Sequence, residues 1–125
     1  MAWVTVLAAF VLSHLAGDYL LQTDFQARHK LGGLDRDPLR RRALFSHVAT
    51  YTLAFVPALI WIGGARALLI AAAVAIPHLV VDDGRGLRAY VRTVKRIDGE
   101  PPAAVLLGVD QTVHLLCLAA AAALA

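Results

Sequence analysis

Histidine and aspartate recur at a spacing of four residues inside apolar stretches of this chain. Seven residues form the set: His14, Asp18, His47, His78, Asp82, Asp110 and His114. A spacing of four places both members of a pair on one face of a helix. Imidazole and carboxylate together suit Zn²⁺, Mn²⁺ or Fe²⁺. The set therefore predicts a buried divalent-metal site that holds one or two ions, with zinc the favoured metal.

The elements that must position these residues are four apolar stretches, at about residues 2–21, 43–62, 65–81 and 103–124. About 20 helical residues cross the ~30 Å hydrocarbon core of a bilayer. Pro57 and Pro77 are expected to bend their helices. The 125-residue chain is thus predicted to be a single all-α integral membrane domain, a polytopic bundle of four transmembrane helices.

Basic residues predict how the chain is oriented in the membrane. Of the twelve Lys and Arg residues, all except Arg66 lie in two stretches, Arg28–Arg42 and Arg85–Arg96. Loops rich in Lys and Arg stay in the cytoplasm, so both termini of a multi-pass cell-membrane protein are expected outside the cytoplasm. Nucleic-acid binding is the less favoured reading of this charge. No oligomeric state is predicted.

The segment 87–97 has apolar residues at helical spacing and basic residues mostly on the other faces. It is predicted to be a short amphipathic helix between the third and fourth spans. Such a helix lies in the headgroup layer or packs on the surface of the protein.

Depth along the helices predicts that the polar residues meet. With the basic loops inside, Asp18 lies ~5 Å and His47 ~6 Å from the cytoplasmic ends of their spans. Lipid cannot solvate ionisable groups, so the faces that carry them must turn into the bundle. Four further residues are candidates for supporting the site or holding a substrate: Gln22, Tyr51, Arg85 and Gln111.

Several functions fit such a site. A metal near the cytoplasmic surface would activate water against a lipid or phosphate ester, with Arg85 or Arg88 holding the phosphate. The basic loops would attract an anionic headgroup or a phosphorylated substrate. The alternatives are a non-catalytic hydrogen-bonded network, a proton or ion pathway, and a bis-histidine haem site, against which the three aspartates argue. The nearly purely apolar outer halves of the spans favour a dead-ended site over a channel.

Three strings carry a resemblance to a known family: HLAGDYLLQTD at residues 14–24, HxxxD at residues 78–82 and DQxxH at residues 110–114. With the Ser46-His47 pair, they resemble the small bacterial membrane proteins of domain of unknown function 3307. The resemblance implies a four-span protein of a bacterial inner membrane and no stated activity. In that family's pattern a Lys follows the Asp of the third span, whereas the nearby basic residue here is Arg85. Membrane-bound metal-dependent hydrolases are a looser analogy.

Overall fold

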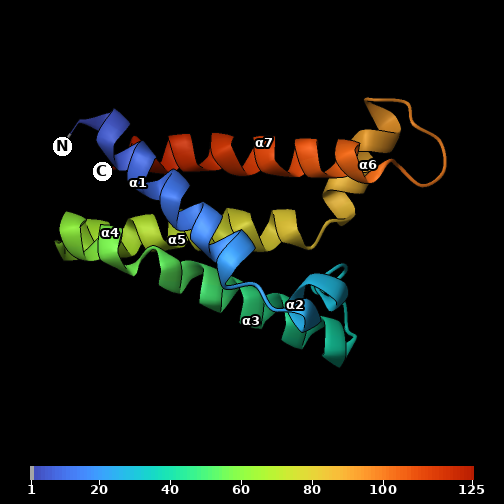
Figure 1. Cartoon of the computed structure of the whole chain (residues 1–125), viewed down its shortest axis with the longest axis horizontal. Coiled ribbons are helices and arrows are strands. Elements are labelled where there is room, and N and C mark those ends of the chain that lie inside the picture. Colours follow the sequence, from blue (N-terminus) through green and yellow to red (C-terminus); the bar gives the residue numbers. More distant parts are fainter. Residues whose placement is uncertain (1) are drawn as a thin grey trace.

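The computed structural model describes residues 2–125, and in this range every regular element is a helix. The elements, drawn in Figure 1, are α1 (Trp3–Leu15), the π-helix η1 (Ala16–Leu20), α2 (Asp24–His29), α3 (Pro38–Ala54), α4 (Val56–Ile62), α5 (Gly64–Asp82), α6 (Arg85–Thr93) and α7 (Ala103–Ala122). The predicted all-α class is confirmed.

Three of these helical segments are long and apolar enough to cross a membrane: Trp3–Leu20, Gly64–Asp82 and Ala103–Ala122. A fourth is obtained if α3 and α4, which are bent by 49° relative to each other, count as one span. The bend lies at Phe55, two residues before Pro57. Proline has no N–H to donate and clashes with the carbonyl four residues earlier, so the helix breaks there as predicted. Pro77, by contrast, lies inside an uninterrupted α5.

Helix boundaries differ from the predicted ones where capping decides them. α3 begins at Pro38, five residues before the predicted span, because the Asp37 side chain accepts hydrogen bonds from the N–H groups of Leu39 and Arg40. Proline at the first helical position needs no N–H partner. The short helix α2 was not predicted, although Thr23 and Gln26 form a capping box at its start.

The amphipathic helix is also shorter than predicted. α6 runs over residues 85–93 instead of 87–97, starts after Gly84 in the left-handed conformation (φ 76°) and ends before Arg96, whose φ is 54°. α6 therefore turns sharply away from the end of α5.

The bundle has two different ends (Figure 1). Both chain termini lie with α4 at one end, while α2 and α6 lie toward the other. An apolar core that includes Val6, Phe10, Phe55, Ile70 and Leu118 fills the half near the termini. The histidine and aspartate residues occupy the half toward α2 and α6, where the helices come from the basic loops.

Candidate metal centre

Four helical segments bring the seven predicted residues into one cluster, here called the polar cluster. α1 and η1 supply His14 and Asp18, α3 supplies His47, α5 supplies His78 and Asp82, and α7 supplies Asp110 and His114. All are buried except Asp110, which is partly exposed. The residues come from segments up to 100 positions apart, so their meeting depends on the helix packing as well as on the spacing of each pair.

Within the polar cluster, Asp18, His47, His78 and Asp82 form what we call the four-residue group, whose ligand atoms all lie within 4.8 Å of one another. The Nε2 atom of His47 lies 3.1 Å from Nε2 of His78, 3.3 Å from Oδ1 of Asp18 and 2.8 Å from Oδ2 of Asp82. Nε2 of His78 lies 3.4 Å from each of the same two carboxylate oxygens.

These distances are close to those between ligands in a tetrahedral metal site. Bonds of ~2.0 Å at tetrahedral angles place neighbouring ligand atoms about 3.3 Å apart. Two imidazole nitrogens and two carboxylate oxygens are a common zinc donor set. Oδ1 of Asp18 is buried and has no hydrogen-bond partner within residues 2–125. A buried carboxylate oxygen without a partner is costly, so the residues present fit a divalent metal.

Asp18, Asp110 and His114 form a second set, the three-residue group, that shares Asp18 with the first. Nδ1 of His114 donates to the backbone carbonyl of Asp110 at 2.9 Å, since a carbonyl can only accept. In the neutral ring this leaves a lone pair on Nε2, which lies 3.4 Å from Oδ1 of Asp82. A histidine whose Nδ1 is held by a carbonyl is the usual arrangement of a metal-bound imidazole.

His14 lies outside both groups, because its ring nitrogens are already engaged. Nε2 donates to Oε1 of Gln111 at 2.9 Å, and Nδ1 accepts from the hydroxyl of Tyr51 at 3.0 Å. Gln111 in turn donates to Oδ2 of Asp110 at 3.0 Å. His14 is one of the seven predicted ligands, but hydrogen bonds to Tyr51 and to Gln111 of α7 occupy both of its ring nitrogens.

Tyr51 supports two histidines at once. Its ring stacks on that of His78, with centroids 3.4 Å apart and planes inclined by 4°. Gly17 makes room for this ring, since a Cβ atom there would lie 2.6 Å from Cδ2 of Tyr51. Gly17 lies in the π-helical turn of η1, and such turns are frequent at functional sites.

Lys30 is a member of the site that the sequence did not indicate. Its Nζ atom donates to Oδ2 of Asp82 at 2.6 Å and to Oε1 of Gln22 at 2.7 Å. Gln22, one of the predicted supporting residues, therefore holds a lysine and not a metal-bound histidine. Lys30 was counted only as loop charge, and no spacing links it to Asp82, 52 residues later.

Asp83, the residue after Asp82, is not the solvated surface carboxylate that its sequence position next to the end of the third span suggests. Its side chain is buried, its Oδ1 accepts from the N–H of Leu34 at 2.8 Å, and its backbone carbonyl accepts from Gly32. Arg85 pairs with Asp83 at 2.7 Å, and this hydrogen bond raises the pKa of the exposed guanidinium. Asp83 thus fastens the loop after α2 to the end of α5.

A pocket of about 410 Å³, here called the basic pocket, opens onto the polar cluster. Asp82 and Asp110 line it together with three cationic residues, Arg28, Lys30 and Arg88. Arg85 is not part of this lining, so Arg88 is the better placed of the two predicted phosphate-binding residues. The basic pocket therefore places three cationic side chains beside two carboxylates of the cluster.

Comparison with known proteins identifies the family of this chain but assigns no activity to it. No curated protein and no solved structure matched the chain. A family described as proteins of unknown function, DUF3307, matches residues 6–125, nearly the whole chain. The chain therefore belongs to the DUF3307 family.

Proposed function

We propose that this chain is a membrane-embedded metalloenzyme that hydrolyses a phosphate ester at the polar cluster. Membrane insertion is supported by the outer surface of the bundle. In each of the three long apolar segments no more than 22% of residues are buried inside the structure. Leu12, Ile60, Leu68 and Leu116 are among the exposed side chains. Helices that are apolar on their outward faces are typical of membrane spans.

Metal binding is the first part of the proposal, and the spacing of the four-residue group carries it. Five ligand–ligand distances of 2.8–3.4 Å converge on one point from four buried side chains. Zinc suits two imidazoles and two carboxylates. The three-residue group would hold a second ion, with the Asp18 carboxylate shared between them.

Hydrolysis is the second part. A divalent metal bound here would lower the pKa of a coordinated water and polarise a phosphoryl oxygen. Lys30 and Arg88 would bind the anionic ester from the basic pocket. Asp110, the most accessible carboxylate of the cluster, would orient the attacking water with a carboxylate lone pair that does not bind the second ion. Its position is fixed by Gln111, which donates to its Oδ2.

The alternative functions are less well supported. Ion transport needs a polar route through both halves of the bundle, but apolar residues fill the half near the termini. A purely structural hydrogen-bond network would leave two of the proposed ligand atoms, Oδ1 of Asp18 and Nε2 of His114, without partners in residues 2–125. Networks satisfied only in part are unfavourable in a low-dielectric interior.

Elemental analysis of the detergent-purified chain tests the metal, and phosphate release from glycerol 3-phosphate tests the chemistry. We expect about one or two equivalents of zinc per chain and turnover that chelation abolishes. The paired variant His47→Ala/His78→Ala should lose both, whereas His29→Ala, which changes the histidine outside the cluster, should keep both. Less than a tenth of an equivalent, with no uptake on addition of zinc, would overturn the metal site.

A further inference from the structure

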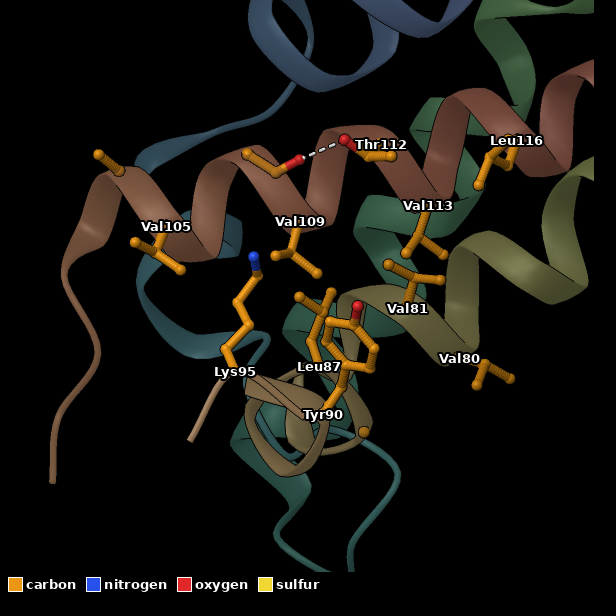
Figure 2. Close-up of a pocket in the computed structure, with 13 residues that line it drawn as sticks. Val80, Val81, Leu87, Tyr90, Lys95, Val105, Val109, Thr112, Val113 and Leu116 are labelled. Atoms are coloured by element: carbon orange, nitrogen blue, oxygen red, sulfur yellow. Dashed lines mark hydrogen bonds between the residues drawn. The ribbon is translucent and has the colours of Figure 1, made fainter. Parts of the chain in front are cut away.

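A large hollow lies beside the polar cluster, between α5, α6 and α7. We call it the apolar groove; its volume is about 820 Å³. Figure 2 shows its wall, which Val80, Leu87, Tyr90, Val105, Val113 and Leu116 help to form. Thr112 also lines it, but its hydroxyl donates to the carbonyl of Gly108 at 2.7 Å. The groove therefore offers apolar contacts along most of its surface.

The apolar groove and the basic pocket share two residues, Val81 and Leu87, which line both. The two hollows are therefore adjacent, and the second one contains Asp82, Asp110 and Lys30. The groove is almost wholly apolar, whereas the basic pocket combines apolar walls with Arg28, Lys30 and Arg88. Together they fit a single amphiphilic molecule with an anionic head.

The length of the groove matches one leaflet of a bilayer. On α7 its lining extends from Ala104 to Leu116. Twelve helical steps rise about 18 Å, slightly more than half of the ~30 Å hydrocarbon core. An acyl chain that enters from one leaflet would therefore lie along the groove with its ester end near α6.

The charge in the lining of the groove favours a lipid with an anionic head group. Lys95 is the charged residue in the lining of the groove; it is exposed and forms no ion pair within residues 2–125. Its amino group points toward α7, and the hydroxyl of Tyr90 points into the same hollow (Figure 2). Lysine and tyrosine at one end of an apolar surface are typical of the membrane interface, where they meet lipid phosphates.

We propose that the substrate of the polar cluster is an anionic lipid phosphate, whose acyl chain lies in the apolar groove and whose phosphate reaches the basic pocket. This inference rests on the proposed hydrolase. In the reaction, water attacks phosphorus, the bond from phosphorus to the lipid oxygen breaks, and a proton from the water passes to that oxygen. The products are inorganic phosphate and the lipid alcohol.

Gly108 provides a direct test, because a Cβ atom there would have no neighbour within 4 Å. Gly108→Trp should fill the groove without displacing backbone. Leu68→Trp is the matched control, since Leu68 is 76% exposed and lies outside the groove lining. The substrates are palmitoyl lysophosphatidic acid and glycerol 3-phosphate, which carry the same phosphate with and without an acyl chain.

We expect the zinc-loaded wild-type protein to favour the lipid at least a hundredfold in kcat/KM. Gly108→Trp should reduce this preference tenfold or more, mainly through KM, and Leu68→Trp should retain it. Lys95→Gln should weaken binding of lysophosphatidic acid in native mass spectrometry, but not binding of neutral monopalmitoylglycerol. An unchanged preference in Gly108→Trp would overturn the lipid proposal and leave the hydrolase intact. Lipid binding that Gly108→Trp removes, in a protein that releases no phosphate from either compound, would support the groove and overturn the hydrolase.

Discussion

The Nε2 atoms of His47 and His78 face each other at 3.1 Å, although the two residues come from different helices. Both nitrogens also lie within 3.5 Å of the same Asp18 and Asp82 oxygens. Imidazole rings rarely point nitrogen to nitrogen unless a proton or a metal is shared between them. A metal shared by these two nitrogens would stabilise the folded protein.

Zinc should stabilise the folded protein through the four-residue group. A ligand that binds only the folded state, at a hundredfold excess over its Kd, stabilises by about 2.7 kcal/mol. Asp82→Asn should lose most of this gain, because it removes a charged ligand whose Oδ2 contacts His47 at 2.8 Å. Thermal unfolding in detergent, with zinc and with chelator, measures the difference. Asp98→Asn, in the loop before α7, is the control. Equal stabilisation of Asp82→Asn and wild type would show that zinc binds elsewhere.

Lys30 should oppose metal binding while it assists turnover. Its ammonium group lies 2.6 Å from Oδ2 of Asp82 and so competes with a cation for this carboxylate. Lys30→Met should tighten zinc affinity roughly tenfold, since a nearby positive charge is removed. The same variant should lower kcat/KM for a phosphate ester, because the anion loses a partner in the basic pocket. Competition with a zinc indicator and phosphate release give the two values. If Lys30→Met raised both zinc affinity and kcat/KM, or lowered both, this assignment of Lys30 would be contradicted.

Substitution by alanine should destabilise the protein at Gly17 and stabilise it at Gly108. At Gly17 a Cβ atom would lie 2.6 Å from Cδ2 and 3.2 Å from Cα of Tyr51, so the helices must separate. Gly17→Ala should destabilise the protein by about 1–3 kcal/mol and weaken zinc binding through displacement of Tyr51. Gly108→Ala has free space and should stabilise α7 by about 0.5–1 kcal/mol. Chemical unfolding of both variants provides the comparison, and equal effects would contradict the close packing at Gly17.

Asp83 should control the loop after α2. Asp83→Ala removes the acceptor for the N–H of Leu34 and should destabilise this attachment by about 1–3 kcal/mol. We expect trypsin to cleave after Arg36 faster in the variant, because a detached loop adopts more readily the extended conformation that a protease binds. Asp35→Ala in the same loop is the control, since its side chain is exposed and only reaches the neighbouring N–H of Arg36. Equal cleavage rates in the two variants would contradict an anchoring role for Asp83.

The sequence predicted the long helices well, because apolar runs and prolines act locally. The break near Pro57 follows from the missing N–H of proline, and the pairing of His78 with Asp82 follows from helical spacing. The early start of α3 could also have been read from Asp37 followed by Pro38, a common N-terminal capping signal.

Contacts made by loops could not be predicted in the same way. The position of Lys30 depends on how the loop folds back over α5, and Asp83 is buried only because this loop covers it. His14 matches the spacing of a ligand, but its role depends on Tyr51 and Gln111, which come from two other helices. Helical periodicity shows which residues share a face; it does not show which neighbour reaches a given nitrogen first.

The division of ligands among the helices has a consequence for biosynthesis. All four residues of the four-residue group lie between positions 18 and 82, whereas the three-residue group requires α7. Chains generally fold from the N-terminus as they are made. An unfinished chain that has released α5 from the ribosome already carries a complete first ligand set. At the proposed two-metal site, the order of translation would then set the order of metal loading, with the second ion bound only after α7 has been made.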